Sequence, residues 1–207
     1  MGGVAAEAVV ADAERWAGQL LGHCTPRWDH SAGVAKTAAG LVHAVRHDEA
    51  EVLVAAAWLH DIGYAAELVD TGFHSLDGAR YLRARGVSDR LCRLVANHTA
   101  AWVEAEARGL AESLAAEFPA ELSPVADALT YADLVTGPAG QPLGVDQRIA
   151  EILERYEAAH VVHRSIRRAT PELLATVRRV EDRVARVVAT KAPQARTVPA
   201  APAFTRG

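Results

Sequence analysis

Cysteine is scarce in this chain, and its scarcity excludes two kinds of scaffold. Cys24 and Cys92 are the only cysteines among 207 residues, and they lie far apart. Two such cysteines make no disulfide framework, and their spacing matches no thiolate zinc site. We therefore expect a reducing, cytoplasmic location, and any bound metal would have to rely on nitrogen and oxygen ligands.

Long apolar runs and a basic excess are also missing. No stretch approaches the roughly 20 apolar residues of a membrane span, and acidic Glu7, Asp12 and Glu14 stand where a targeting segment would be basic. The formal net charge of −4 argues against an extended nucleic-acid surface. We expect a soluble protein with neither a membrane nor a nucleic acid as partner. A small anionic substrate would need only a local basic pocket.

Aromatic residues are few, at 5%, whereas half of the chain is hydrophobic and rich in alanine, leucine and valine. This composition favours helices over sheets, and the length suits a single buried core. We predict an all-α protein with one helical-bundle domain over residues 1–189. Residues 190–207 contain Pro193, Pro199 and Pro202 and no periodic stripe, so we predict a disordered tail. The oligomeric state stays open.

Apolar residues recur at helical spacing in several segments, with start and stop signals between them. Ser123-Pro124 is a strong helix start, Asp48 with Glu51 resembles a capping box, and Ser75 is a further candidate cap. Gly63 and Gly86 are expected helix stops, Gly63 as a left-handed cap. The helices are expected at residues 4–21, 31–46, 48–59, 75–85, 88–98, 104–118, 123–136, 146–159 and 170–189.

Six residues stand in an order that metal chemistry could use: His30, His60, Asp61, His74, His98 and Asp133. The His60-Asp61 dipeptide ends an almost wholly apolar helix, where the imidazole can bind one ion and the carboxylate can bridge two. Asp133 lies within another apolar helix. Burying its charge without a partner would cost several kcal/mol, so an ion partner or a metal is expected there. The three other histidines lie near helix ends or loops, where they could converge.

Three segments give these residues a family context. Arg27-Trp28-Asp29-His30, Trp58 to Gly63, and Tyr131-Ala132-Asp133 resemble the HD superfamily of metal-dependent phosphohydrolases, over roughly residues 27–137. The resemblance implies a helical bundle in which His30, His60, Asp61 and Asp133 bind one metal. Histidines placed like His74 and His98 mark the binuclear members, so that these two and Asp61 would hold a second ion. The residues around His74 and His98 further resemble the branch that hydrolyses diadenosine tetraphosphate symmetrically.

This resemblance predicts a hydrolase that cleaves a phosphate ester or anhydride of a small phosphorylated compound, with a nucleotide as the favoured substrate. Asp61 would touch both ions, and a bridging water of lowered pKa would attack phosphorus. With nitrogen and oxygen ligands only, two divalent transition-metal ions are expected, either iron, manganese, cobalt or nickel.

Tyr64 departs from the family pattern. Many related phosphohydrolases have a lysine at this position, where it can neutralise phosphate charge, whereas a phenol carries no positive charge at neutral pH. Arg27, three residues before His30, is the best replacement because a guanidinium can bind two phosphate oxygens. Tyr64, Arg80 and Arg148 are further candidates for substrate binding. The sequence assigns no role to three more arginines, Arg164, Arg167 and Arg168.

Two other functions are also compatible with the sequence. The ligand order also resembles that of di-iron oxygenases related to myo-inositol oxygenase, and the missing lysine is compatible with a polyol or phosphonate substrate. Alternatively, the bundle could be a non-enzymatic module that binds a nucleotide or a partner and uses its metal only structurally.

Overall fold

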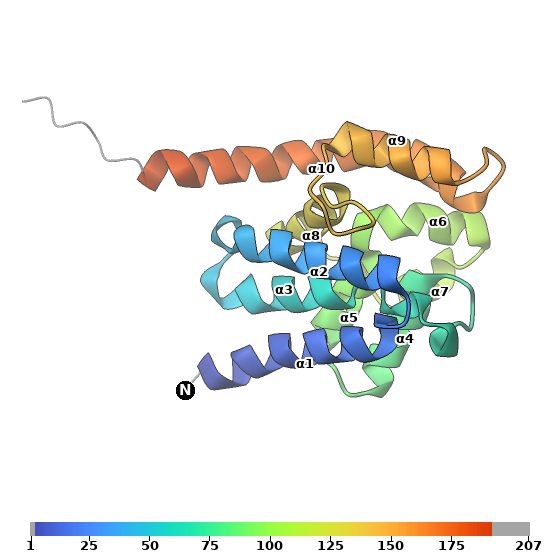
Figure 1. The fold of residues 1–207 in the computed structure, drawn as a ribbon, viewed down its shortest axis with the longest axis horizontal. Helices are drawn as coiled ribbons and strands as arrows, with labels where there is room; N and C mark the ends of the chain where they lie inside the picture. Colours follow the sequence, from blue (N-terminus) through green and yellow to red (C-terminus); the bar gives the residue numbers. More distant parts are fainter. Residues whose placement is uncertain (1–2, 192–207) are drawn as a thin grey trace, which may run out of the picture.

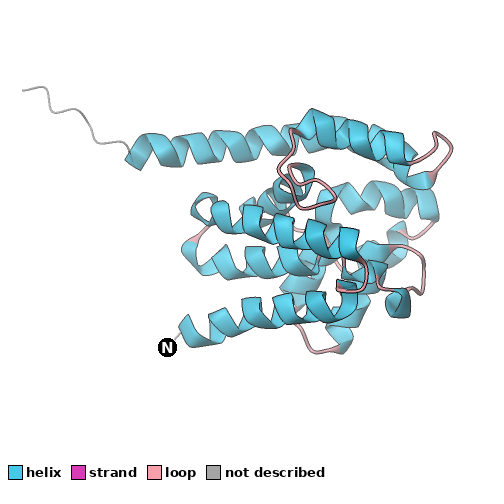
Figure 2. Cartoon of the chain, viewed as in Figure 1, coloured by secondary structure: helices cyan, strands magenta, loops and turns pink. Residues whose placement is uncertain are grey.

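Helices form nearly all of the regular structure in the computed structural model, which describes residues 3–191 (Figures 1 and 2). Within this range there is no strand, only an isolated antiparallel bridge between Thr136 and Pro142. The prediction of an all-α fold is therefore confirmed. Residues 192–207, most of the predicted tail, lie outside the described residues. None of the described helices combines enough length and apolar character to cross a membrane.

Three N-terminal helices pack side by side (Figure 1). They are α1 (Gly3–Leu21), α2 (Thr25–Gly40) and α3 (Ala50–Leu59). The central α3 contacts α1, α2, α5 and α8, and its buried residues are Leu53, Ala55, Ala56, Ala57 and Leu59. Its many small alanines let neighbouring helices approach on several sides, and this burial contributes hydrophobic stabilisation in proportion to the apolar area removed from water. The His60-Asp61 dipeptide is thereby delivered to the centre of the molecule.

The remaining helices surround the far end of α3. They are α4 (His74–Ala84), α5 (Asp89–Asn97), α6 (Ala101–Arg108), α7 (Ala111–Glu117), α8 (Pro124–Leu134), α9 (Val145–Arg155) and α10 (Val161–Lys191). Short 3-10 turns lie between helices: η1 (Val42–Ala44) and η2 (His47–Glu49) between α2 and α3, η3 (Ile62–Tyr64) and η4 (Ala66–Leu68) between α3 and α4, and η5 (His98–Ala100) between α5 and α6. Figure 1 shows α9 alongside one end of the long α10, which also contacts α6 and α8. The α9–α10 pair thus covers the side of the bundle that carries α8.

Among the predicted helix signals, the start at Ser123 and the stop at Gly86 are confirmed, whereas two of the expected N-terminal caps are wrong. Ser123 caps α8, its hydroxyl accepting the Ala126 N–H at 3.1 Å, and Gly86 has the expected left-handed φ of +77° after α4. By contrast, α3 begins at Ala50 without a side-chain cap, because the carboxylate of Asp48 accepts the Arg46 Nε–H at 3.0 Å instead. Ser75 is no cap either, since α4 already begins at His74.

Several helix boundaries also differ from the predicted ones. The helix expected to reach residue 46 ends at Gly40, and the helix expected at 104–118 is two helices, separated at Gly109 with φ +73°. α9 ends at Arg155, earlier than predicted. α10 begins at Val161 and continues through Pro171. The buried Ala169 and Leu173 hold the chain in place on both sides of this proline, so tertiary packing overrides a local stop signal.

Gly63 is required for space and not, as predicted, for a left-handed cap. Among the described residues, the glycines with positive φ are Gly72, Gly86, Gly109 and Gly140. A Cβ on Gly63 would overlap the carbonyl oxygen of His74 and lie 2.7 Å from the Gly78 nitrogen. The turn after α3 therefore lies directly against the start of α4, and this close approach brings Asp61 beside His74.

Candidate metal centre

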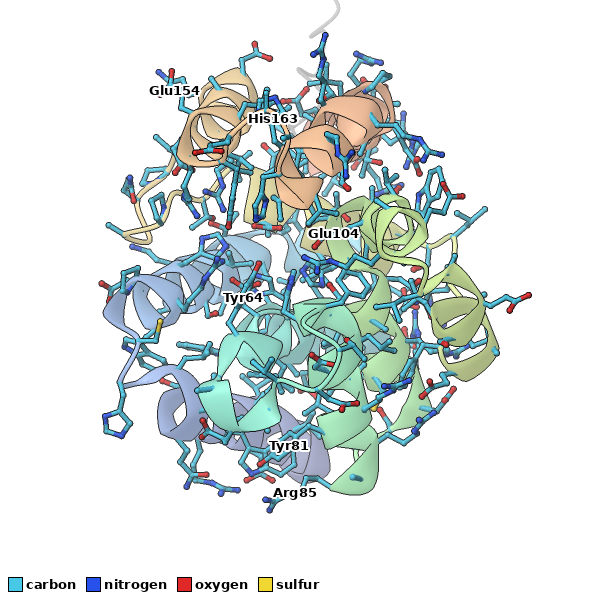
Figure 3. The ribbon with its side chains drawn as sticks, turned by 90° about the vertical axis from the view of Figure 1, so that its right-hand side faces the viewer. Tyr64, Tyr81, Arg85, Glu104, Glu154 and His163 are labelled. Carbon is cyan, nitrogen blue, oxygen red and sulfur yellow. The ribbon has the colours of Figure 1, made fainter. Side chains whose placement is uncertain are left out.

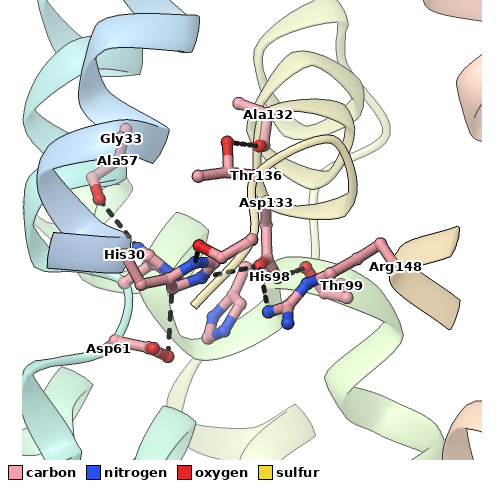
Figure 4. A network of polar contacts seen from close by, with 12 residues as sticks. His30, Gly33, Ala57, Asp61, His98, Thr99, Ala132, Asp133, Thr136 and Arg148 are labelled. Atoms are coloured by element: carbon pink, nitrogen blue, oxygen red, sulfur yellow. Dashed lines mark hydrogen bonds and ion pairs between the residues drawn. The ribbon is translucent and has the colours of Figure 1, made fainter. Parts of the chain in front are cut away.

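Six side chains from five parts of the chain converge on one cluster. They are His30 in α2, His60 and Asp61 at the end of α3, His74 at the start of α4, His98 at the start of η5, and Asp133 near the end of α8. All except His74 are buried. Figure 4 shows four of them, His30, Asp61, His98 and Asp133, around a common centre. All six predicted ligands are thus near one another, although they are spread over about a hundred residues of sequence.

The ligand atoms form two sets. One set is His30, His60 and Asp133, and the other is Asp61, His74 and His98; within each set, one ligand atom per residue lies within 4.8 Å of the others. Asp61 connects the sets, because its Oδ1 lies 3.6 Å from Nε2 of His60 and 3.5 Å from Nε2 of His74. A carboxylate oxygen thus lies between one histidine of each set, as a bridging ligand requires.

Three of the histidines have one ring nitrogen fixed by the backbone. Nδ1 of His30, His60 and His98 lies 3.1, 2.7 and 2.6 Å from the carbonyl oxygens of Gly137, Ala57 and Val95, respectively. Because a carbonyl oxygen only accepts, each Nδ1 carries the proton and donates it. In the neutral ring, Nε2 then presents a lone pair to the cluster. This is the arrangement by which proteins orient histidine ligands toward a metal.

The free nitrogens of the cluster are suited to a cation. Nε2 of His60 is buried and has no hydrogen-bond partner in the described part of the chain, which is costly for a polar atom unless a ligand satisfies it. Nε2 of His74 and Nε2 of His98 face each other at 3.3 Å. Two lone pairs repel at this distance unless a proton or a cation lies between or beside them. The donor set therefore fits a divalent metal with nitrogen and oxygen ligands.

Both carboxylates of the cluster are charged at neutral pH. Burial opposes ionisation of Asp61, but its interactions with His60, Arg27 and His74 outweigh burial and hold the pKa well below 3.8; of these three groups, only the Arg27 guanidinium is charged at neutral pH. The pKa of Asp133 is likewise well below 3.8, because the hydrogen bond and charge of His30 outweigh its burial. The cluster thus contains two buried negative charges, which a divalent cation would neutralise.

The histidines differ in protonation. Burial lowers the pKa of His60 to about 4 and that of His74 well below 6.5, so both rings are neutral lone-pair donors. For His30, the hydrogen bond and charge of Asp133 outweigh burial and raise the pKa above 6.5. Its Nε2 lies 3.0 Å from Oδ1 of Asp133. A proton shared by these two atoms lies where the lone pair of His30 would meet a metal, so protonation and metal binding compete.

Arg27, Tyr64 and His74 form a stack beside Asp61. Arg27 Nη1 donates to Oδ2 of Asp61 at 2.9 Å, and its guanidinium carbon lies 3.6 Å from the centre of the Tyr64 ring. The Tyr64 ring in turn stacks on His74 at 4.1 Å with an interplanar angle of 14°. Burial raises the pKa of Tyr64 above 10, so its phenol is neutral. Tyr64 supplies a flat support for a guanidinium and an imidazole, while Arg27 provides the positive charge.

Two further arginines from the sequence prediction have different surroundings. Arg148 on α9 is buried beside Asp133, with Nη2 at 3.7 Å from Oδ1 of that carboxylate (Figure 4). Arg80 does not line the pocket beside the cluster. Its Nε donates to Glu117 at 3.1 Å and its Nη1 to Asp70 at 3.3 Å. The structure thus places Arg80, predicted as a substrate-binding residue, outside the pocket wall, with its guanidinium paired to these carboxylates.

Of the three arginines without an assigned role, Arg168 packs at the surface between α6 and α10. It pairs with Glu106 at 2.6 Å and lies over the Trp102 ring at 5.4 Å. Arg164 and Arg167 are exposed, and none of the three lines the pocket beside the cluster.

Thr99 is a site residue that the sequence did not indicate. Its hydroxyl donates to Oδ2 of Asp133 at 2.5 Å, and its N–H donates to Thr130 Oγ1 at 3.2 Å. Thr99 and Ala100 have φ values of 50° and 54°, a left-handed conformation that costs roughly 1–3 kcal/mol for a residue with a side chain. This strained turn after His98 brings the Thr99 hydroxyl to α8. The only signal was its position next to a predicted ligand.

A pocket of about 90 Å³ adjoins the cluster. Five of the six predicted ligands line it, all but His60, together with Arg27 and Tyr64. Its opposite wall comes from α9 and α10 and includes Ile152, Tyr156, Ser165, Ile166 and Ala169. Figure 3 shows Tyr64 and Glu104, which also lines the pocket, beneath the α9–α10 pair that carries Glu154 and His163. Arg148 and Arg155 of α9 also line the pocket, so this wall combines apolar side chains with two guanidinium groups.

Comparison with known families agrees with this geometry. The model of the HD domain matches residues 27–159, more than half of the chain, and this range contains all six residues of the cluster. No curated protein and no solved structure is a significant match. Because the family match covers the cluster and most of the helices around it, this chain belongs to the HD domain family.

Proposed function

We propose that this protein is a metal-dependent phosphohydrolase that cleaves a phosphate ester or anhydride, with a nucleotide as the favoured substrate. The HD family consists mostly of metal-dependent hydrolases. The observation that carries the proposal is the position of Asp61. Its Oδ1 lies between His60 and His74, one from each of two sets of metal-ligand atoms, and its Oδ2 accepts a hydrogen bond from Arg27. This arrangement suits two divalent ions next to a phosphate-binding guanidinium.

His30, His60, Asp61 and Asp133 would hold the first ion, and Asp61, His74 and His98 the second. When bound, such ions supply Lewis acidity and a water of lowered pKa. The chain's part is to hold the ligands: backbone carbonyls fix Nδ1 of three histidines, and Thr99 fixes Oδ2 of Asp133. Nitrogen and oxygen ligands favour iron, manganese, cobalt or nickel.

The arginines would orient the substrate. Arg27 and Arg148 each lie beside one carboxylate of the cluster and line the pocket, so their guanidinium groups are in place to bind phosphoryl oxygens and to stabilise charge that develops on them. Tyr64 keeps Arg27 in position by stacking. Ile152 and Ile166 on the opposite wall offer an apolar surface for the organic part of a phosphorylated compound.

The test is hydrolysis of a nucleotide panel by the full chain with its ions counted by elemental analysis. We expect release of phosphate or of a nucleotide, abolished in His60→Ala. His43→Ala is the matched control, because His43 is exposed and lies outside the pocket. Metal-loaded protein that leaves every member of the panel intact would contradict the proposal.

A second candidate is a di-iron oxygenase of the HD type, favoured by one observation: a neutral Tyr64 stands where many related phosphohydrolases have a lysine. Oxygen consumption separates the two, because hydrolysis uses no oxygen. The iron-loaded, partly reduced protein should consume dioxygen with a polyol or phosphonate substrate if this second candidate is right, and should consume none if it hydrolyses phosphate.

A further inference from the structure

Two polar groups on the α9–α10 wall of the pocket have no partner. Nε of Arg148 and Oγ of Ser165 are buried atoms without a hydrogen bond to any described residue. Both residues line the pocket, and they are only 4% and 5% exposed. A buried donor without a partner is unfavourable. Two such donors on one wall of one pocket indicate that a bound ligand supplies the missing hydrogen-bond acceptors.

One edge of the Arg148 guanidinium group has the geometry of an anion-binding site. Nη1 donates to Glu151 at 2.5 Å. Nη2 is 3.7 Å from Asp133, beyond hydrogen-bonding distance, and Nε is unpartnered. The Nε–Nη2 edge of a guanidinium presents two parallel N–H groups, which match two oxygens of a phosphate or carboxylate. In Arg148 this edge makes no hydrogen bond within the described chain.

Ser165 differs from other hydroxyl-bearing residues of its helix. The Thr170 hydroxyl donates to the carbonyl oxygen of Ile166 at 2.8 Å, the usual way for a helical hydroxyl to be satisfied. Ser165 makes no such bond. Ser31 in α2 is also buried and unpartnered, yet it does not line the pocket. What distinguishes Ser165 is therefore its place in the pocket wall beside Arg148.

The rest of this wall does not satisfy the two donors. Its other α9 and α10 residues are Ile152, Arg155, Val162, Ile166 and Ala169, whose side chains carry no acceptor, and the adjoining Tyr156 makes no hydrogen bond to either donor. The hydrogen bond to Glu151 involves only Nη1 of Arg148, and the oxygens of Asp133, 3.7 Å from Nη2, already face His30 and Thr99. An oxygen atom of a bound ligand would give both groups the hydrogen-bond acceptor that they lack.

We propose that Arg148 and Ser165 form an oxyanion subsite that binds the phosphoryl group of the substrate from the α9–α10 side of the pocket, where Arg148 adjoins Asp133. This inference rests on the proposed phosphohydrolase function, and it adds Ser165 as a substrate-binding residue. The phosphoryl oxygens would accept from the Nε–Nη2 edge of Arg148 and from the Ser165 hydroxyl. Because Asp133 is negatively charged, the anion binds only when cations also occupy the cluster.

The experiment measures binding of inorganic phosphate to the metal-loaded full chain by calorimetry, with the ions counted in each variant. We expect Ser165→Ala to weaken binding about tenfold and Arg148→Gln about 100-fold, as for the loss of one and of two charge-assisted hydrogen bonds. Ser165→Thr keeps the hydroxyl and should bind like the wild type. Ser31→Ala is the matched control, a buried and unpartnered hydroxyl outside the pocket, and should also leave binding unchanged.

The outcomes separate this subsite from the proposed function. If the wild type binds ions and phosphate but Ser165→Ala binds phosphate equally well with the same ion content, the subsite is wrong and phosphohydrolysis stands. If the wild type takes up no ion, the proposed function itself fails. If Arg148→Gln folds poorly, Arg148→Lys is the alternative variant. It retains the positive charge but lacks the two parallel N–H donors, so its affinity for phosphate should still fall.

Discussion

Arg27 Nη1 lies 2.9 Å from Oδ2 of Asp61, so the carboxylate between the two ligand sets has a cationic partner of its own. This contact joins α2 to the turn after α3. It occupies one oxygen of Asp61 and leaves the other, Oδ1, facing His60 and His74. Arg27 therefore acts on the cluster in two ways: it orients its central ligand, and it places positive charge at the pocket.

Removing this guanidinium should separate catalysis from metal binding. Arg27→Gln keeps a hydrogen-bond donor near Asp61 but removes the charge, so we expect turnover of the best phosphorylated substrate to fall about 100-fold, with the ion content little changed. Steady-state kinetics and elemental analysis measure the two effects. Arg46→Gln is the control, since Arg46 is exposed and pairs only with Asp48 among the described residues. Equal turnover in Arg27→Gln and in the wild type would exclude the proposed role.

Thr99 should tune metal affinity without being a ligand. Its hydroxyl fixes Oδ2 of Asp133 at 2.5 Å, and loss of such an outer partner typically weakens metal binding about 10–100-fold. We expect Thr99→Val to lower the affinity of the first ion by about tenfold, while Thr99→Ser retains it. A competition titration with a chromophoric chelator gives both affinities. If valine and serine variants bind the ion alike, the hydroxyl does not position Asp133.

Asp127 should stabilise the folded protein at pH values above the range in which its carboxyl group titrates. Its carboxylate accepts from Arg179 at 2.6 Å and from Arg183 at 2.9 Å, which ties α8 to α10. Burial opposes ionisation, but the two arginines outweigh it and lower the pKa below 3.8. The stabilisation is therefore present above pH 3.8 and is lost as the pH falls through the lowered folded-state pKa.

We expect Asp127→Asn to reduce the free energy of unfolding by about 1 kcal/mol at neutral pH, a modest value because Arg179 is half exposed. The difference from the wild type should vanish in acid. Urea denaturation across this pH range measures it. Asp182→Asn, an exposed residue of α10, is the control. If the loss of free energy of unfolding in Asp127→Asn persists unchanged below the folded-state pKa of Asp127, the charge of this carboxylate is not the cause of the loss.

The sequence could predict features that depend on local pattern. The apolar run of α3 and the dipeptide at its end are neighbours in sequence, so the place of His60 and Asp61 in the core follows from hydrophobic spacing. The order of the remaining ligands came from the family resemblance. The all-α fold followed from composition. In each case the information lies within a few residues or in a known motif.

Contacts between distant segments could not be predicted. Thr99 and Asp133 are separated by 34 positions, and nothing near Thr99 indicates which helix its hydroxyl will meet. Arg80 resembled a phosphate ligand as long as its partner Glu117, 37 positions away, was unknown. Ser165 lies in an ordinary helical pattern, and only the fold places it in the pocket. Side-chain partners depend on how helices dock, which a single sequence does not specify.

Gly63 illustrates the same limit and gives the sharpest test of the fold around the cluster. An added Cβ would overlap the His74 carbonyl oxygen, with the backbone of Gly78 also in contact, so Gly63→Ala should lower the free energy of unfolding by about 2–3 kcal/mol. It should also weaken binding of the second ion, because Asp61 and His74 are forced apart. Gly40→Ala is the matched control: nothing lies within 4 Å of its Cβ, so we expect a gain of about 0.5 kcal/mol. Chemical denaturation and metal titration of both variants measure these effects, and equal stability of the two would contradict the close packing of η3 on α4.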